Sequence, residues 1–250
     1  MERTAVRGRL SWLLADVVEL IPETPRVKSI RLRVPGWPGH LPGQHVDLRL
    51  TAEDGYQAQR SYSIANPPAG ENVTITVELV TNGEVSSYVH EELRVGDRME
   101  LRGPIGGYFV WEPARGGPLQ LVGGGSGLVP LMAMARSLGD AEAAVPARML
   151  VSARTQEDLI YRQELSRLPT ELPDLRIDYT LTRSQPDDWK GYDRRVDRAM
   201  LGETTFDADQ NPLIFVCGPT GFVETVANIL RELGHSAEQI RTERFGPTGG

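Results

Sequence analysis

The chain has 250 residues, of which 40% are hydrophobic, and a formal net charge of -7. This size predicts one large domain or two modest ones, and the acidic charge argues against a nucleic-acid partner, which would require a basic surface. No stretch approaches the roughly 20 apolar residues that span a bilayer, and the start, MERTAVRGRL, lacks the apolar block of a secretory signal. We therefore expect a cytoplasmic protein with no membrane partner.

Cys217 is the single cysteine, and the four histidines show no metal-ligand spacing. A disulfide within these residues and an iron-sulfur cluster held by four thiolates are excluded, and no metal site is predicted. Any redox chemistry must therefore use an organic cofactor.

The first half of the sequence is typical of an antiparallel β domain. Residues 73–79 alternate Val, Ile, Val and Leu with Thr and Glu, which is the period-two pattern of a half-buried strand. Similar segments follow Gly/Pro-containing turns such as PGWPGHLPG. The pattern predicts a small barrel whose strands lie at 11–20, 27–34, 44–50, 59–65, 73–79 and 97–101.

The sequence pattern changes after the Gly/Pro-rich stretch 113–118. Short apolar runs then alternate with longer segments whose apolar residues have helical spacing. Such alternation predicts a parallel, doubly wound sheet. We place the domain boundary there, with one domain at 1–114 and the other at 115–250. Buried strands are expected at 119–122, 147–152, 175–181 and 213–217, and helices at 129–138, 157–168 and 222–233, the last closed by Gly234.

Arg60-Ser61-Tyr62-Ser63 stands at the end of a predicted strand and follows Pro42-Gly43-Gln44. An Arg can pair with a pyrophosphate, a Tyr can stack on an aromatic ring, and a Ser hydroxyl can hydrogen-bond a ring nitrogen. These four residues alone are equally consistent with an ordinary strand that carries one surface Arg.

Two further strings place glycines before predicted helices, where unpaired N–H groups bind anions. Gly83-Glu84-Val85-Ser86 precedes the helical-looking SYVHEEL, although a plain Ser N-cap would give the same pattern. GGGSGLVP, starting at Gly123, links a strand to a helix and predicts a phosphate-binding turn. It does not match G-x-G-x-x-G, so a standard Rossmann dehydrogenase is disfavoured, and a purely structural turn remains an alternative.

The last predicted strand ends in Cys217-Gly218-Pro219-Thr220, at the sheet edge where ligands bind in open α/β sheets. A lone Cys is usually a small buried apolar residue. Near the end of the sequence, Glu243-Arg244-Phe245 offers a carboxylate and an aromatic ring, which are equally compatible with a surface acid and a core Phe.

Taken in order, PGQ, RSYS, GEVSS, GGGSGLVP, CGPTG and ERF make the sequence resemble the ferredoxin-NADP reductase family, including the reductase components of bacterial oxygenases. The resemblance covers nearly the whole chain. It implies an N-terminal FAD-binding β-barrel domain, a C-terminal NAD(P)-binding α/β domain, and a cleft between them where flavin and nicotinamide meet.

The resemblance also assigns roles to individual residues. Arg60 would bind FAD phosphate, Tyr62 would stack on the isoalloxazine, and Ser63 would hydrogen-bond flavin N5. Cys217 and Glu243 would lie near the reacting nicotinamide carbon, and Phe245 matches the aromatic residue that covers the flavin, although five residues follow it. The remaining candidate cofactor-binding residues are Ser61, Val77, Gly83, Val85, Ser86, Gly124, Gly125, Ser126, Arg154, Thr182, Arg183, Gly218, Pro219 and Thr220.

The resemblance leaves the nicotinamide and the electron acceptor open. Thr182-Arg183, with Arg154, resembles the phosphate-binding residues of NADP-using members, so we expect NADPH, but similar strings occur in NADH-using relatives. A ferredoxin or flavodoxin that feeds an oxygenase is the expected carrier. The alternatives are an NADH-dependent oxygenase reductase, a flavin reductase, and a non-catalytic flavin-binding subunit of a larger complex.

Overall fold

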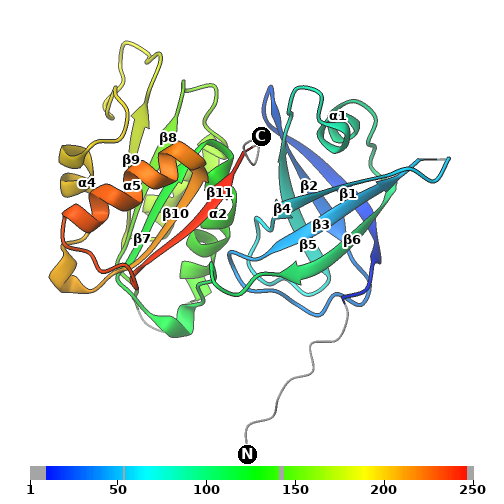
Figure 1. Ribbon diagram of the computed structural model, residues 1–250, viewed down its shortest axis with the longest axis horizontal. Helices are drawn as coiled ribbons and strands as arrows, with labels where there is room; N and C mark the ends of the chain where they lie inside the picture. Colours follow the sequence, from blue (N-terminus) through cyan, green and yellow to red (C-terminus); the bar gives the residue numbers. More distant parts are fainter. Residues whose placement is uncertain (1–9, 53, 141–143, 247–250) are drawn as a thin grey trace, which may run out of the picture.

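The computed structural model describes residues 10–52, 54–140 and 144–246. Residues 1–9, which bear on the expected absence of a secretory signal, lie outside these ranges, and so do the residues after Gly246. Two units lie side by side, a barrel and a layered α/β unit (Figure 1). The predicted boundary between residues 114 and 115 falls in the segment that connects their sheets and stays a prediction.

Six antiparallel strands form a barrel, as predicted, and their order is β4-β3-β6-β1-β2-β5. Its two edge strands meet, because Ile64 bridges Ile75 and the Ala65 N–H donates to the Thr74 carbonyl at 2.7 Å. Alternating side chains point inward and fill the barrel with buried Val, Ile and Leu. The elements are β1 (Leu13–Thr24), β2 (Val27–Arg33), β3 (His45–Thr51), β4 (Gln57–Ser63), β5 (Asn72–Glu78), β6 (Arg98–Ile105) and the helix α1 (Glu84–Glu91).

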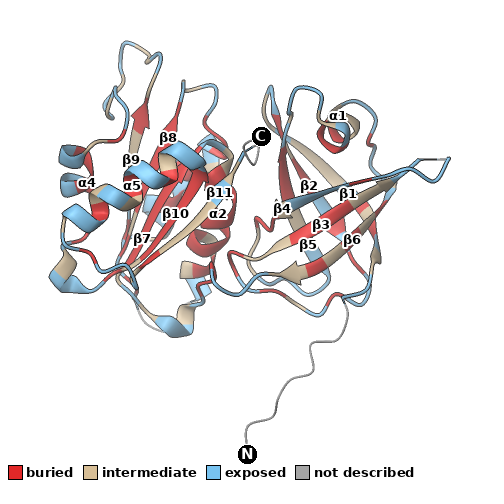
Figure 2. Cartoon of the chain, viewed as in Figure 1, coloured by how far each residue is buried: buried red, intermediate tan, exposed pale blue. Residues whose placement is uncertain are grey.

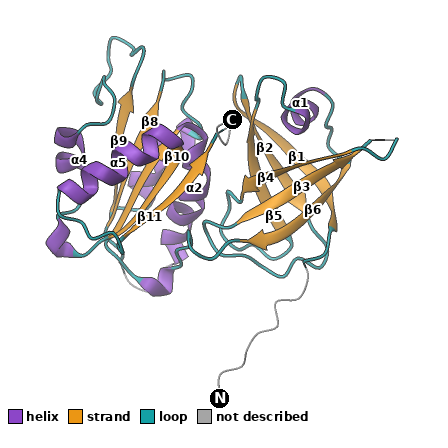
Figure 3. Ribbon diagram, viewed as in Figure 1, coloured by secondary structure: helices purple, strands orange, loops and turns teal. Residues whose placement is uncertain are grey.

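The second unit is a five-stranded parallel sheet in the order β11-β10-β7-β8-β9, with helices on both faces (Figure 3). One face packs against α2 and α3 and the other against α4 and α5, which confirms the predicted doubly wound class. The strands are β7 (Leu119–Gly124), β8 (Ala147–Ala153), β9 (Leu175–Leu181), β10 (Leu213–Pro219) and β11 (Ile240–Phe245), and the helices are α2 (Leu128–Arg136), α3 (Arg162–Glu171), α4 (Arg198–Thr204) and α5 (Thr220–Glu232).

Three elements differ from the prediction. The sequence analysis did not anticipate β11 or α4. It also started α3 at residue 157, whereas the helix begins at Arg162. Tyr161, just before it, has a left-handed backbone with a φ of 57°, so residues 157–161 cannot continue the helix backwards.

The α2 helix lies between the parallel sheet and the barrel (Figure 1). Every residue from Leu128 to Ala135 is therefore buried (Figure 2). The same hydrophobic core contains Phe109 and Trp111 from the segment that follows the barrel. The Phe109 ring meets Phe215 of β10 edge-on, with the ring centroids 5.3 Å apart. One continuous core thus fixes the two units against each other.

Gly43 explains the PGQ string in terms of packing. A Cβ at this position would overlap the Phe109 carbonyl, so only glycine lets the loop before β3 touch the connecting segment. Its φ of +97° is also one that other residues rarely adopt. No helix in the described part of the chain is long and apolar enough to cross a membrane.

Candidate functional site

The carboxyl ends of the parallel strands gather the predicted nucleotide-binding strings at one edge of the sheet. The glycine-rich turn follows β7 and occupies Gly125–Gly127 before α2 begins. At Gly127 a Cβ would overlap the carbonyl of Cys217, so glycine is needed for the turn to pack against β10. This close packing places the turn beside the end of the strand that carries the thiol.

A pocket of about 220 Å³ opens at this edge, between the sheet and the barrel. The barrel contributes the β1–β2 turn and Glu78 at the end of β5. The α/β unit contributes six of the predicted site residues, namely Gly124, Gly125, Ser126, Arg154, Thr182 and Pro219. Residues as far apart in sequence as Thr24 and Phe222 are thus brought to one interdomain pocket. The carboxyl edge of a parallel sheet is where ligands bind in such folds.

Cys217 and Glu243 lie opposite each other on the parallel strands β10 and β11. Burial and the nearby Glu243 carboxylate raise the pKa of the fully buried Cys217 thiol well above 9.0. Burial also raises the pKa of Glu243 to about 7. One Glu243 carboxylate oxygen is buried and has no hydrogen-bond partner among the described residues. A protonated thiol and an acid that titrates near neutrality therefore stand side by side.

The same strand pair positions the other residues of both strings. Phe245 pairs with Pro219 and packs partly buried against the core. Gly218 is buried, and Thr220 begins α5 with its side chain exposed. The resemblance implied that the thiol and the acid lie near the same nicotinamide carbon, but the strand β11 that pairs them was not predicted.

On the barrel, Ser63 ends β4 with its hydroxyl buried and without a hydrogen-bond partner in the described structure. Burial raises the pKa of the neighbouring Tyr62 to about 12, so its phenol stays neutral. Arg60 is exposed, and its guanidinium donates to the carbonyl of Gln59 at 2.6 Å. The Ser61 hydroxyl, in contrast, already has a protein partner, because it donates to Asp47 at 2.7 Å.

The α1 helix begins after Gly83 and has no side-chain cap, so its first N–H groups are open to an anion. The alternative of a Ser N-cap is wrong, since Ser86 lies within the helix and its hydroxyl donates back to the Gly83 carbonyl at 3.0 Å. The side chains of Val77 and Val85 are buried in the barrel core. These two predicted residues can therefore reach a ligand only through their backbones.

The arginines predicted to select the nicotinamide lie together at the ends of β8 and β9. The Thr182 N–H donates to the Ala153 carbonyl at 3.0 Å, and the Arg183 N–H donates to the Arg154 carbonyl at 2.9 Å. Both Arg154 and Arg183 are exposed. Arg154 and Thr182 line the pocket, whereas Arg183 stands just outside its lining.

His45 is a further residue of this region that the sequence analysis did not single out. It lies directly opposite Ser63 in the β3–β4 register, so the two side chains share one face of the sheet. Burial lowers the pKa of the imidazole, although Asp47 opposes this shift. In the sequence, His45 directly follows Pro42-Gly43-Gln44, and this position next to a family motif could have indicated it.

Comparison with known proteins places each unit in a described domain family. A model of the oxidoreductase FAD-binding domain matches residues 20–110, and a model of the oxidoreductase NAD-binding domain matches residues 121–228. The chain is 32% identical over 242 residues to ferredoxin–NADP reductase B of Sorangium cellulosum, covering 92% of this chain and 96% of that protein.

Two other comparisons extend the range of relatives. The chain is 34% identical over 211 residues to the glycine betaine monooxygenase reductase subunit of Chromohalobacter salexigens, covering 83% of this chain but only 56% of that protein. The crystal structure of an Amycolatopsis cytochrome P450 reductase superposes with a TM-score of 0.82 at 26% identity, over 98% of this chain and 74% of that one. The chain thus spans only about half the length of some of its relatives.

Proposed function

The chain belongs to the ferredoxin-NADP reductase family of FAD- and NAD(P)-binding oxidoreductases, and on that premise we propose that it moves electrons between NADPH and a one-electron carrier protein. The observation that carries the proposal is the pairing of Cys217 with Glu243 on β10 and β11. The Cys217 backbone packs against Gly127 of the glycine-rich turn, and residues 124–126 of that turn line a pocket shared with the barrel. Hydride transfer between two rings needs such a site at the junction of two nucleotide-binding domains.

The residues fit the two cofactors on grounds of hydrogen bonding. Ser63 and Glu243 each hold a buried oxygen with no partner in the described structure, which is costly unless a ligand supplies one. We assign Ser63 and Tyr62 to the flavin ring, and Arg60 with the open N-terminus of α1 to its pyrophosphate. When bound, FAD accepts a hydride and passes electrons on singly.

The chain's own groups would orient the nicotinamide and exclude water. Cys217 is fully buried and protonated, so its uncharged side chain packs beside the site and does not act as a nucleophile. Glu243, with a pKa of about 7, can hold or release a proton near the reacting carbon. Ser126 in the glycine-rich turn lies where the two halves meet.

For the nicotinamide, we assign Arg154, Thr182 and Arg183 to the 2'-phosphate of NADPH. Their clustering at the ends of two adjacent strands supports this, because guanidinium groups bind phosphate through paired hydrogen bonds. For the acceptor, we propose a ferredoxin or flavodoxin. Similarity to a monooxygenase reductase subunit supports a carrier that in turn supplies an oxygenase.

Anaerobic titration of the FAD-loaded protein with NADPH and, separately, NADH tests the proposal. We expect NADPH to bleach the flavin absorbance at lower concentration than NADH. Arg183→Ala should raise the KM for NADPH about tenfold or more, the loss expected for charged hydrogen bonds, and leave that for NADH within about twofold. Arg231→Ala, on the exposed face of α5, is the control. Protein that cannot be loaded with FAD would refute the proposed function, and preferential bleaching by NADH would refute the choice of NADPH.

A further inference from the structure

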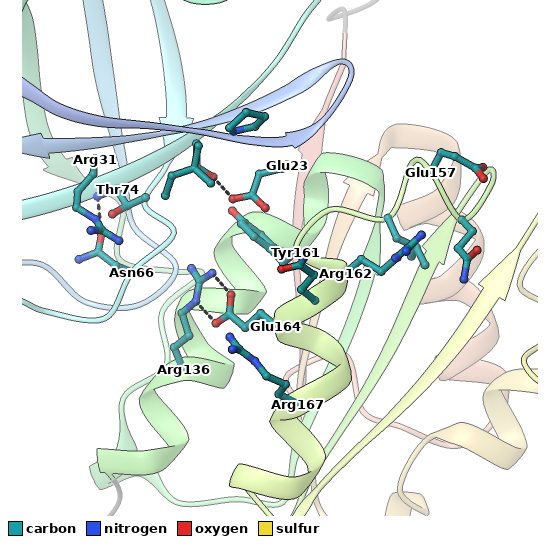
Figure 4. Close-up of a pocket in the computed structure, with 16 residues that line it drawn as sticks. Glu23, Arg31, Asn66, Thr74, Arg136, Glu157, Tyr161, Arg162, Glu164 and Arg167 are labelled. Carbon is teal, nitrogen blue, oxygen red and sulfur yellow. Dashed lines mark hydrogen bonds and ion pairs between the residues drawn. The ribbon is translucent and has the colours of Figure 1, made fainter. Parts of the chain in front are cut away.

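A second cavity, of about 600 Å³, lies between the barrel and the helices α2 and α3 (Figure 4). It shares no lining residue with the pocket at the sheet edge. Its wall contains Tyr161, Arg136 and Glu164 from the α/β unit and Glu23 and Ser29 from the barrel. Hydrogen bonds from Tyr161 to Thr76 and from Arg136 to the Ala65 carbonyl link this group across the two units.

Tyr161 is the centre of this arrangement. Its backbone is left-handed, with a φ of 57°, a conformation that bulky residues rarely adopt and that surrounding contacts must maintain. Its side chain is buried, and its hydroxyl is hydrogen-bonded to the hydroxyl of Thr76 on β5 of the barrel. The guanidinium of Arg136 lies over the ring, 4.7 Å from its centroid. Both contacts hold the ring in one position.

Arg136, the last residue of α2, ties three elements together. Its guanidinium donates to both carboxylate oxygens of Glu164 on α3, at 2.8 and 2.6 Å. It also donates to the Ala65 carbonyl, just after β4 of the barrel. Such a paired, planar interaction fixes orientation as well as distance. Tyr161 therefore stands on a rigid support.

The hydroxyl groups of Tyr161, Thr76 and Ser29 form a chain of hydrogen bonds that ends at the Glu23 carboxylate, and each hydroxyl donates to the next group. The Ser29 hydroxyl donates to the Glu23 carboxylate at 2.7 Å and lies 2.8 Å from the Thr76 hydroxyl. Because Ser29 has one proton to donate, Thr76 must donate to Ser29. For the same reason Tyr161 must donate to Thr76. The phenol proton of Tyr161 thus joins the α/β unit to this chain of hydroxyl groups.

These contacts lie close to the interdomain pocket. Thr76 is two residues from Glu78 on β5, and Tyr161 follows Ile160, and both Glu78 and Ile160 line that pocket. On the basis of the proposed function, we propose that Tyr161 is a positioning residue that, through Thr76, sets how closely the nicotinamide-binding unit approaches the flavin-binding barrel. A misplacement of about 1 Å between reacting groups costs on the order of 100-fold in rate.

Paired variants separate this role from general packing. Tyr161→Phe keeps the ring and removes the hydroxyl, Thr76→Val removes its partner, and Thr76→Ser restores it. Tyr179→Phe is the matched control, because the Tyr179 hydroxyl donates to the Leu165 carbonyl at 3.3 Å within the α/β unit. In single-turnover reduction of bound FAD by NADPH, we expect Tyr161→Phe and Thr76→Val each to slow the rate about tenfold.

The two single variants remove the same hydrogen bond, between Tyr161 and Thr76, so their effects should not add. The Tyr161→Phe/Thr76→Val double variant should be little slower than either single variant. Thr76→Ser and Tyr179→Phe should stay within about twofold of the wild type, and the Kd for NADPH should change by no more than about twofold in all variants. Additive losses, or an equal loss in Tyr179→Phe, would overturn the proposal.

A second measurement does not depend on turnover. Hydrogen exchange in the cofactor-free protein should rise about threefold or more at residues 74–78 and 160–165 in Tyr161→Phe and remain unchanged there in Tyr179→Phe. If wild-type protein accepts no hydride, the proposed function fails, but this result still decides whether Tyr161 joins the two units. Unchanged exchange in Tyr161→Phe would refute the inference.

Discussion

Glu243 is half-buried in the folded protein, with one carboxylate oxygen fully buried, and its pKa of about 7 lies above the ordinary value of 4.5. Between these two pH values the folded state keeps a proton that the unfolded chain has released. The contribution of Glu243 to the free energy of unfolding of the cofactor-free protein should therefore be largest below pH 4.5, fall by about 3 kcal/mol up to pH 7, and level off above it.

Urea unfolding at a series of pH values measures this effect. Glu243→Gln should remove most of the decrease, whereas Glu224→Gln, on the exposed side of α5, should leave it intact. A pH dependence that survives in Glu243→Gln would assign the effect to another group.

Cys217 illustrates how burial suppresses reactivity. The attacking species in alkylation is the thiolate, and here the thiol is fully buried with its pKa raised by burial and by Glu243. We expect iodoacetamide to modify the native protein at least about 100-fold more slowly than the urea-unfolded chain, as followed by mass spectrometry. Rapid labelling of the native state would show that β10 opens readily at this position.

At the level of elements, the glycine-rich turn depends on close packing. A methyl group at Gly127 would overlap the Cys217 carbonyl, which belongs to the backbone and cannot rotate away. Gly127→Ala should lower the free energy of unfolding by about 2 kcal/mol or more and weaken nicotinamide binding. Gly202→Ala in α4, where the methyl group meets open space, should instead stabilise by about 0.5–1 kcal/mol. Chemical denaturation of both variants tests the contrast, and equal effects would contradict it.

The elements also show where sequence patterns suffice. The barrel strands were predicted from the alternating pattern of residues 73–79 and from the Gly/Pro-containing turns that separate the other segments. The strands β7 to β10 were predicted because apolar residues dominate them. The β11 strand, IRTERF, carries three charged residues in six and leaves most of its side chains partly exposed at a sheet edge. Its charged composition is atypical of a buried parallel strand.

The sequence motifs of the candidate site could be predicted, but the way the fold places their residues relative to one another could not. RSYS and GGGSG each signalled a ligand through local residue chemistry. The proximity of Cys217 to Glu243 was implied only by the family resemblance, because the pairing of β10 with β11 that produces it was not predicted from the residues. Tyr161 gave no local signal, because a left-handed Tyr is stabilised only by tertiary contacts such as those with Thr76 and Arg136.

At the scale of the whole molecule, one hydrophobic core joins the two units. It includes Val27 and Ala65 of the barrel and Phe109 and Trp111 of the connecting segment, packed against α2 and the parallel sheet. Since removing a part of such a core affects both units, the protein should unfold in one cooperative transition although it contains two nucleotide-binding domains. Differential scanning calorimetry of the cofactor-free protein should show a single peak.

Phe109→Ala should break this coupling. It removes the ring that packs edge-on against Phe215 and should lower the free energy of unfolding by about 3–5 kcal/mol, after which the barrel and the α/β unit should melt in two resolved transitions. Phe206→Ala, at a buried Phe inside the α/β unit that stacks on Arg148, should also destabilise but keep one transition. If both variants keep a single transition, the joint core is not what couples the units, and the polar contacts of Tyr161 and Arg136 would have to account for the cooperativity.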